Sequence, residues 1–256
     1  MGARGRESYS IQSVENALDV LEALSEEEGE VRISRLSQRL GMNKTSVFRL
    51  MATFESRGYV EREDGSSKYR LGLSAYEVAQ KLLSRMELLR KARPVMEKLV
   101  RSTKEAVYLT VPRTGEVLFF DMVDTTYQVK IVSLVGRRYP LETTAAGRVQ
   151  LAFAEESDRP QLDEGQKLDL TRIHAQGFCQ DTGTLGDGVT ALAVPLLTKG
   201  GRLAGSLCLV APDFRMSEEI IRDELAPQLV EAGTIISSKL GYVGHFLGGG
   251  VSPGRN

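Results

Sequence analysis

The spacing of hydrophobic residues predicts two short helices joined by a tight turn. The first covers 33–40, and the second begins after Asn43, which favours the N-cap because its side chain accepts a hydrogen bond from the first helical turn. Gly41 ends the first helix, where a positive φ is common. The second helix turns four hydrophobic side chains inward: Val47, Leu50, Met51 and Phe54. This arrangement is typical of a helix-turn-helix.

Alternating residues next predict a β-hairpin. Segments 59–62 and 68–71 are strand-like, and Asp64-Gly65 between them is a strong signal for a tight turn. On the second strand two cations alternate with two side chains expected to pack, Lys68 and Arg70 with Tyr69 and Leu71. A hairpin that follows the second helix directly makes the unit a winged helix-turn-helix, which we place at 11–73.

Two further helices flank this unit. The helix before it carries hydrophobic residues at helical spacing: Ile11, Val14, Leu18, Leu21 and Leu24. These side chains are expected to cover the helix-turn-helix, and the apolar surface left over suits contact with a second copy. After the hairpin, Ser74 and Glu77 form a capping box that begins a linker helix at 74–90. We place Pro94 at the first position of the helix that follows.

Past residue 100 the hydrophobic period shortens from helical to alternating. Strands are predicted at 107–111, 117–122, 128–134, 191–197 and 203–210. Helices are predicted at about 145–154, at 165–175 and from an N-cap at Ser217 to about 240. This order implies an α+β fold, with a largely antiparallel sheet flanked by helices in a domain at 91–242. The polar, glycine-bearing segments 1–10 and 243–256 are expected to be a disordered arm and tail.

Positive charge is concentrated in one part of the chain. The 256 residues carry a formal net charge of −1, yet nine Lys and Arg residues face four acids across 32–70. Such a local excess is what binding to nucleic-acid phosphates requires. The acids at 26–28 are badly placed for this, so that end of the first helix should point away from a duplex.

The composition also excludes several classes of protein. No apolar run approaches the roughly 20 residues of a membrane span, and the N-terminus has no signal-peptide core. The two cysteines, Cys179 and Cys208, suit neither a disulfide framework nor a metal-type spacing. We therefore expect a protein of the reducing cytoplasm with no membrane partner, no metal and no cofactor.

The predicted DNA-reading side chains stand at the start of the second helix. Four of them are expected to enter the major groove: Lys44, Thr45, Ser46 and Arg49. Arg49 is able to bind guanine or phosphate through two N–H groups, and Asn43 orients the helix. The hairpin supplies three cations to hold the DNA backbone: Arg62, Lys68 and Arg70.

A different class of function remains as the alternative. The N-terminal unit could serve only as a protein contact attached to a small-molecule-binding or enzymatic domain. His174 and Cys179 could act as base and nucleophile beside Asp181, although such residues near a helix end and in a strand are usually structural. The glycines at 183–188 lack the strand-to-helix setting of a dinucleotide fingerprint. The salt dependence of DNA affinity separates the two classes.

Short motifs along residues 10–242 add a family resemblance. In the N-terminal part they are SVENAL at 13–18, TSVFRL at 45–50, GYV at 58–60 and KYRLG at 68–72. In the C-terminal part they are VGRRYPL at 135–141, TTAAGR at 143–148, GF at 177–178, GV at 188–189 and AVP at 193–195. Each motif is weak alone, but in this order and spacing the chain resembles the IclR family of bacterial transcriptional regulators.

The resemblance implies a function and an assembly. The C-terminal domain would be GAF-like and would bind a small organic effector that controls DNA binding. The protein would be a homodimer formed through the DNA-binding domains, often paired again into a tetramer, and would act on a pseudo-palindromic operator. It would be a regulator, expected here to repress, and not an enzyme.

The resemblance also places the effector pocket. Its walls would be Gln128 and Ile131 from the strand at 128–134, with Tyr139, Ala145, Ala146, Asp181, Ala191, Cys208 and Val210. Residues 144–147 open a helix whose first amides are able to accept a carboxylate, which favours an organic acid. Tight packing of helix on sheet through alanines is the alternative. Family members often carry an acid where Thr184 stands and polar groups near Cys208 and Val210. This more apolar wall favours an aromatic or longer-chain acid.

Overall fold

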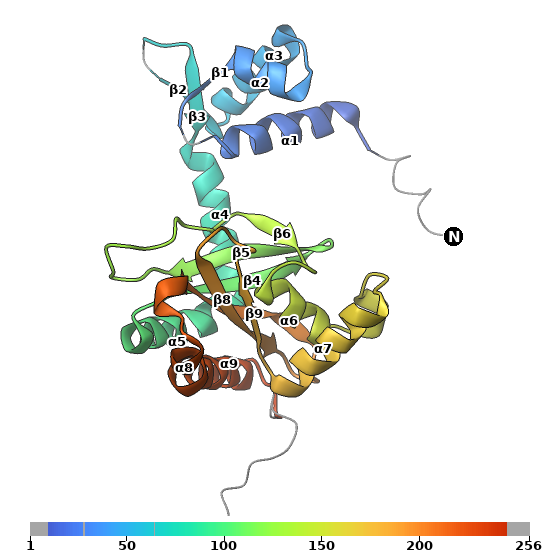
Figure 1. Cartoon of the computed structure of the whole chain (residues 1–256). Helices are drawn as coiled ribbons and strands as arrows, with labels where there is room; N and C mark the ends of the chain where they lie inside the picture. Colours follow the sequence, from blue (N-terminus) through green and yellow to red (C-terminus); the bar gives the residue numbers. More distant parts are fainter. Residues whose placement is uncertain (1–9, 28, 64, 245–256) are drawn as a thin grey trace, which may run out of the picture. The chain divides into compact units, whose positions relative to one another are not determined.

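The chain folds into two compact units. The computed structural model describes residues 10–27, 29–63 and 65–244, which divide between Met1–Arg85 and Met86–Asn256 (Figure 1). The arm expected at 1–10 and the tail expected at 243–256 lie mostly outside the described residues. No helix in the described ranges is both long and apolar enough to cross a membrane.

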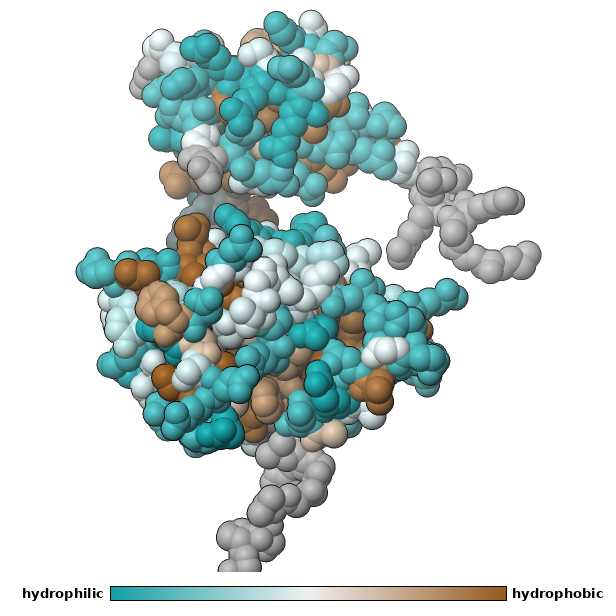
Figure 2. All heavy atoms as spheres, viewed as in Figure 1, coloured by the Kyte–Doolittle hydropathy of each residue, from teal (hydrophilic) through white to brown (hydrophobic). Residues whose placement is uncertain are grey.

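The N-terminal unit contains the predicted helix-turn-helix. Helices α2 (Ile33–Leu40) and α3 (Lys44–Ser56) are joined by Gly41, whose φ is +65°, and by Asn43, whose side chain accepts from the Ser46 amide at 2.8 Å. Val47 and Met51 are fully buried against α1 (Gln12–Ser25) and the sheet. The face of this unit seen in Figure 2 is mainly hydrophilic. These observations confirm the predicted helices, turn and cap.

The wing is a three-stranded antiparallel sheet in the order β1-β3-β2. Strands β2 (Val60–Arg62) and β3 (Lys68–Leu71) form the predicted hairpin, and β1 (Val31–Arg32) adds a strand that the sequence does not predict. Asp64 of the predicted turn lies outside the described residues. Tyr69 packs in the core as expected, whereas Leu71 is exposed because it ends β3 beyond the hydrophobic cluster.

Helix α1 covers the motif with only its C-terminal half. Val20, Ala23 and Leu24 are buried, while three residues predicted to pack are about half exposed: Ile11, Val14 and Leu18. The N-terminal half of α1 therefore extends past the core and leaves an apolar stripe uncovered.

Two helices occupy the region predicted as a single linker helix. α4 (Leu73–Arg85) has no buried residue, and α5 (Glu87–Thr103) begins two residues later. The predicted capping box is absent, because the Ser74 hydroxyl donates to the Arg57 carbonyl at 2.9 Å. Pro94 lies inside α5 and not at its start. A proline there removes one backbone hydrogen bond, and the buried apolar stripe of α5 offsets that loss.

The C-terminal unit is built on a six-stranded antiparallel sheet in the order β6-β5-β4-β9-β8-β7. The strands are β4 (Ala106–Arg113), β5 (Glu116–Val123), β6 (Arg138–Pro140), β7 (Cys179–Thr182), β8 (Val189–Leu197) and β9 (Leu203–Pro212). Helices α6 (Ala145–Phe153) and α7 (Glu164–Gln176) lie on one side (Figure 1). On the other side lie α5, α8 (Glu218–Ile220) and α9 (Ala226–Lys239), with a π-helical turn before α9. The predicted α+β architecture is confirmed.

The prediction of a strand at 128–134 is wrong. Residues 124–137 form a loop in which Val129 and Val132 are mostly exposed, and within 128–134 only Leu134 is buried. The neighbouring position beside β5 is taken by β6, which pairs with Glu116, Val117 and Leu118. The β-branched residues of the loop therefore have no strand to pair with.

Candidate DNA-binding and effector sites

The exposed face of α3 lies directly opposite its buried face. Thr45, Phe48, Arg49 and Ala52 are all exposed and follow one another at i, i+3, i+4 and i+7, which places them in one stripe. We call these four residues the α3 stripe. Of the predicted reading residues, Thr45 and Arg49 belong to it, Lys44 is exposed beside it, and Ser46 is half-buried. Within the described ranges, Lys44 and Arg49 make no ion pair.

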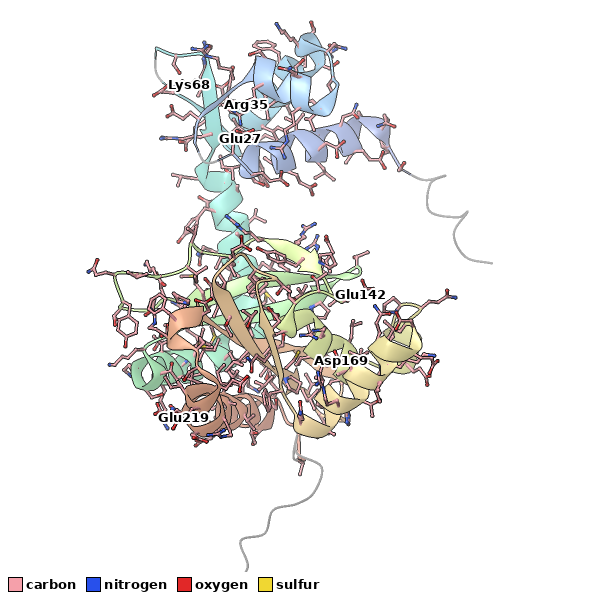
Figure 3. The ribbon with its side chains drawn as sticks, in the orientation of Figure 1. Glu27, Arg35, Lys68, Glu142, Asp169 and Glu219 are labelled. Carbon is pink, nitrogen blue, oxygen red and sulfur yellow. The ribbon has the colours of Figure 1, made fainter. Side chains whose placement is uncertain are left out.

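The arginines of α2 are held by the acidic end of α1. Arg35 and Glu27 form an ion pair at 2.8 Å, and both are labelled in Figure 3. Arg39 pairs with Glu26 and, at 3.4 Å, with Glu27. These pairs neutralise charge on α2, so the unpaired positive charge of the motif lies on α3.

The predicted wing cations also have partners within the unit. The Arg62 Nε donates to the Ser66 carbonyl at 3.0 Å, and its guanidinium lies 6.0 Å from the centre of the Tyr69 ring. Lys68 faces Glu30 at 3.6 Å, and Arg70 faces Glu61 at 3.1 Å. Exposed pairs of this kind are weak, so phosphate is able to compete for these cations.

The sheet brings most of the predicted effector residues together in two adjacent rows. In the first row Asp181 pairs with Ala191, which pairs with Val210. In the second row Cys208 pairs with Ala193 on β8 and with Tyr108 on β4. Side chains two positions apart on a strand share a face, so both rows point toward α6.

Helix α6 closes this face of the sheet. Ala145, Ala146, Ala191, Cys208 and Val210 are at most 1 % exposed and belong to one buried cluster, which we call the α6 cluster. Two hollows in the surface of this unit lie beside Phe178 and Pro227 and beside Leu203. These five predicted wall residues are therefore packed together and closed to solvent in this structure.

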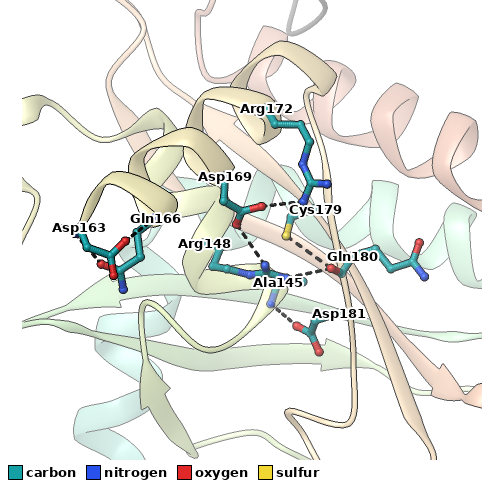
Figure 4. Close-up of polar contacts among 9 residues, drawn as sticks. All are labelled: Ala145, Arg148, Asp163, Gln166, Asp169, Arg172, Cys179, Gln180 and Asp181. Carbon is teal, nitrogen blue, oxygen red and sulfur yellow. Dashed lines mark hydrogen bonds and ion pairs between the residues drawn. The ribbon is translucent and has the colours of Figure 1, made fainter.

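The start of α6 already holds a carboxylate. The Ala145 amide donates to Asp181 (Figure 4). The Thr144 hydroxyl accepts from the Gly147 amide at 3.1 Å. Asp181 also accepts from the Thr184 hydroxyl. Burial raises the pKa of Asp181, although these hydrogen bonds and the charge of Arg148 act in the opposite direction. The prediction that the first amides of α6 are free to bind the carboxylate of an effector is therefore wrong for Ala145 and Gly147.

Arg148 ties α6 to its neighbours. Its guanidinium pairs with Asp169 of α7 at 3.1 Å and donates to the Gln180 carbonyl of β7 at 2.9 Å (Figure 4). Asp169 also pairs with Arg172 at 2.6 Å. These contacts hold the β7 strand, and hence the neighbouring Asp181, against α6.

Tyr108 is a polar group of this face that the sequence-based site omits. The side chain is fully buried, and burial raises its pKa to about 12. Its hydroxyl lies near the Leu134 backbone without a hydrogen bond of normal geometry. Its ring packs edge-on against Phe119, which packs in the same way against Tyr139. In the sequence, a tyrosine at a position of the strand that is expected to face the core is the feature from which this buried hydroxyl could have been predicted.

The two residues predicted from the 128–134 strand have different positions. Ile131 packs against the α6 cluster, but Gln128 is exposed and does not join it. The loop is fastened from outside by Arg215, which donates to the Val129 carbonyl at 3.1 Å, pairs with Glu105 at 2.6 Å and lies over the Tyr127 ring.

The residues considered for catalysis are not arranged for it. The His174 ring stacks on Phe153 with ring centres 4.5 Å apart. Cys179 is buried, its thiol points to the Gln180 carbonyl, and burial raises its pKa to about 12. A thiol in this state is a poor nucleophile. The described residues hold no cluster of three His, Cys, Asp or Glu side chains suited to a metal ion.

Two family models match the chain in the order of its two units. The model described as the IclR helix-turn-helix domain matches residues 13–64, and the model described as bacterial transcriptional regulator IclR C-terminal matches residues 80–238. The second match spans more than half of the chain. The chain belongs to the IclR family. Members of this family are DNA-binding transcriptional regulators with an effector-binding domain, so this protein is a regulator and not an enzyme.

Relatives over the full length agree with this membership. The HTH-type transcriptional regulator KdgR of Escherichia coli K12 is 32 % identical over 249 residues, which cover 91 % of this chain and 94 % of the relative. The regulator XynR of the same organism is 27 % identical over 248 residues, which cover 91 % and 98 %.

Solved structures show the same fold. An IclR transcriptional regulator from Alicyclobacillus acidocaldarius superposes with a TM-score of 0.79 at 22 % identity, covering 91 % of this chain and 100 % of that one. An IclR homolog from Microbacterium hydrocarbonoxydans, solved in complex with 4-hydroxybenzoate, has a TM-score of 0.74 at 22 % identity, covering 90 % and 99 %. At this level of identity the likeness concerns the fold.

Proposed function

We propose that the protein is a repressor that binds a pseudo-palindromic operator as a homodimer and responds to a small organic acid. It acts in the cytoplasm, where bacterial DNA lies. The observation that carries the DNA-binding part is the α3 stripe, which places Thr45 and Arg49 on the face opposite the core, with the unpaired Lys44 beside it. Repression is supported by a 26 % identical relative, the DNA-binding transcriptional repressor YiaJ of Escherichia coli K12.

In the proposed complex α3 lies in the major groove. Asn43 fixes the start of the helix, Thr45 and Arg49 face base edges, and Ser46 and Lys44 contact the flanking phosphates. The wing cations Arg62, Lys68 and Arg70 leave their weak acidic or carbonyl partners for phosphate oxygens. Arg49 makes the largest contribution, because it has no acidic partner to give up and its guanidinium is able to donate two hydrogen bonds to one base or phosphate.

The homodimer is supported by the apolar stripe that α1 leaves uncovered. Val14 and Leu18 lie on the N-terminal half of α1 and Ile11 directly precedes it, and all three side chains are about half exposed or more. A two-fold contact of this surface would set two α3 helices on two half-sites. Pairing of dimers into a tetramer is the second assembly that the family resemblance implies.

The effector site lies in the α6 cluster and prefers an apolar body with one acidic group. Ala145, Ala146, Ala191, Cys208 and Val210 supply apolar contact, with Ile131 and Tyr139 at the edge. The acidic group must exchange with Asp181 at the start of α6 or bind beside it. The homolog that binds 4-hydroxybenzoate supports an aromatic acid as the first class to test. Gln128 would contact the effector only after movement of the loop at 124–137.

The first experiment is a fluorescence-anisotropy titration of the full chain against the DNA that flanks its own coding sequence. Competitor DNA is present, and the titration is repeated at several salt concentrations. Competitor-resistant binding that weakens linearly in log affinity against log salt supports the proposal. Binding that competitor abolishes would leave only a basic surface and would contradict it.

The effector is then sought with the same protein–DNA complex. Aromatic acids, longer-chain acids and acids of two or three carbons are added in turn, and release or strengthening of the complex is recorded. A response to the small acids alone would contradict the proposed class. The variant Ala191→Leu, which overpacks the α6 cluster and occupies the proposed effector position, should lower the stability of the C-terminal unit and lose the response to the effector. Its DNA binding without effector should be retained, because the N-terminal unit is unchanged.

A further inference from the structure

An exposed aromatic ring lies in the middle of the α3 stripe. Phe48 is 53 % exposed, although Val47 before it is fully buried. Isolated exposed apolar residues are common and need no explanation. What distinguishes Phe48 is its position between Thr45 and Arg49, with Ala52 continuing the stripe one turn later. The stripe therefore has an apolar centre with a cationic side chain beside it.

The orientation of Phe48 is determined by the core of the unit. Val47 and Met51 are fully buried, and Leu50 and Phe54 pack against the same cluster, so α3 has little freedom to rotate. The Asn43 cap fixes where the helix begins. Phe48 consequently points in the same direction as Arg49, toward whatever the stripe contacts.

The chemistry of the major groove suggests what an apolar centre would meet. Each base pair presents hydrogen-bond donors and acceptors there, and the 5-methyl group of thymine is the apolar feature. A phenyl ring offers no hydrogen bond and would leave polar base edges without a partner, so it discriminates against them. When the same ring contacts a thymine methyl group, the apolar surfaces of both the ring and the methyl group are removed from water.

We propose that Phe48, together with Ala52, reads thymine in the operator by contact with its 5-methyl group. This assignment rests on the proposed placement of α3 in the major groove. Arg49 then binds the adjacent guanine or phosphate, and Phe48 fixes the identity of the base next to it. Phe48 contributes to sequence specificity and adds nothing to the salt-dependent part of the affinity.

The test is a double-mutant cycle between protein and DNA. The full chain selects its sites from a random duplex pool, and the consensus duplex is resynthesised with deoxyuridine in place of each thymine in turn. Uracil keeps the base pair and removes only the methyl group. At one or two positions in each half-site, uracil should weaken binding of the unmodified protein about fourfold, the effect of one buried methyl-sized group. Phe48→Ala, which leaves only Ala52 to contact the methyl group, should lose most of this difference between the thymine and uracil duplexes.

Two control variants make the cycle specific. Phe48→Leu keeps an apolar contact and should retain part of the preference for thymine. Phe214→Ala removes a phenylalanine that is 71 % exposed in the other unit, and it should leave the preference unchanged. The salt slope should be the same for all variants, because none of them removes a phosphate contact.

Three outcomes would overturn the inference. If the unmodified protein binds uracil and thymine duplexes equally at every position, no methyl group is read. If Phe48→Ala keeps the full preference, Phe48 does not read the methyl group. If Phe48→Ala changes the oligomeric mass in solution, the ring is covered by a second copy. Failure of the proposed DNA binding itself looks different, since no sites would then be selected from the pool.

Discussion

The α3 stripe and the α6 cluster are built in opposite ways. The stripe is an exposed row on a single helix, and its residues lie within eight positions of one another. The cluster joins residues as distant as Tyr108 and Cys208, which are paired across β4 and β9, and it is closed to solvent. A substitution on the stripe should therefore change binding alone. A substitution in the cluster should change stability and ligand response together, because the same atoms serve both.

The largest expected effect comes from Gly147 in α6. A Cβ at this position would lie 2.2 Å from the Leu141 carbonyl oxygen, so Gly147→Ala forces α6 away from the backbone before it. We expect the free energy of unfolding of the C-terminal unit to fall by about 3 kcal/mol. Chemical denaturation of the full chain measures this fall.

The matched control is Gly165→Ala on the exposed start of α7, where the nearest atom is a side-chain oxygen at 3.3 Å. Alanine in such a helical position is usually neutral or slightly stabilising. Equal midpoints for the two variants would show that α6 has room to move. The cluster would then not be the tightly packed site described here.

The second prediction concerns the stripe and leaves stability unchanged. Arg49→Ala should weaken operator binding by about 1–3 kcal/mol while the melting temperature stays the same. Arg49→Lys sharpens the comparison, because lysine keeps the charge but lacks the planar pair of donors. Affinity restored by lysine would assign Arg49 to phosphate, and affinity not restored would assign it to guanine. If Arg49→Ala binds the operator with unchanged affinity, Arg49 does not contact a base.

The same contrast explains what the sequence could predict. The helix-turn-helix follows from residues close together in the chain, such as the cap at Asn43 and the period of Val47 and Met51, so its elements and exposed face are predictable. Strands β8 and β9 are likewise predictable from their continuous apolar runs. Their registry with β7 and β4, which sets Asp181 beside Ala191, is not contained in any local pattern.

Two predictions fail for reasons that the local sequence pattern does not contain. The residues at 128–134 have the composition of a strand, but β6 occupies the neighbouring position on β5 and leaves them as a loop. The amides at the start of α6 were expected to be open, but Asp181 reaches Ala145 from 36 positions further along the chain. The residues that decide the two outcomes, β6 in the first case and Asp181 in the second, lie outside the segments from which the predictions were made. The family resemblance identified the cluster members, and the fold added Tyr108 to them.

The third prediction tests whether Tyr108 belongs to the effector site. Tyr108→Phe removes a buried hydroxyl without a well-formed hydrogen bond and keeps the ring, so stability should stay the same or rise slightly. Affinity for the effector, measured by calorimetry, should fall by about 1 kcal/mol if the hydroxyl binds it. Operator affinity without effector should not change. An unaltered effector affinity would make Tyr108 a packing residue only.

The smallest expected effect is a change in how stability depends on pH, caused by Asp181. Burial raises the pKa of Asp181 in the folded state above its ordinary value of 3.8. Between the unfolded and folded pKa values the folded state binds more protons, so stability is greatest below this window and falls as pH rises through it. Asp181→Asn keeps an acceptor for the Ala145 amide and cannot ionise. The variant should therefore be at least as stable as the unmodified protein at pH 7.5, and its advantage should shrink as pH falls toward 4.

Denaturation curves at several pH values measure this difference. Asp181→Ala is the matched variant, because it removes both the charge and the acceptor. It should be less stable than Asp181→Asn at every pH, since the Ala145 amide loses its partner at a buried helix start. If the stability of Asp181→Asn relative to the unmodified protein increased as pH falls, the observed pH dependence would be opposite to the prediction. It would mean that the charged carboxylate stabilises α6. In that case an acidic effector would have to displace a favourable internal anion, and the cost of that displacement would lower its affinity for the site.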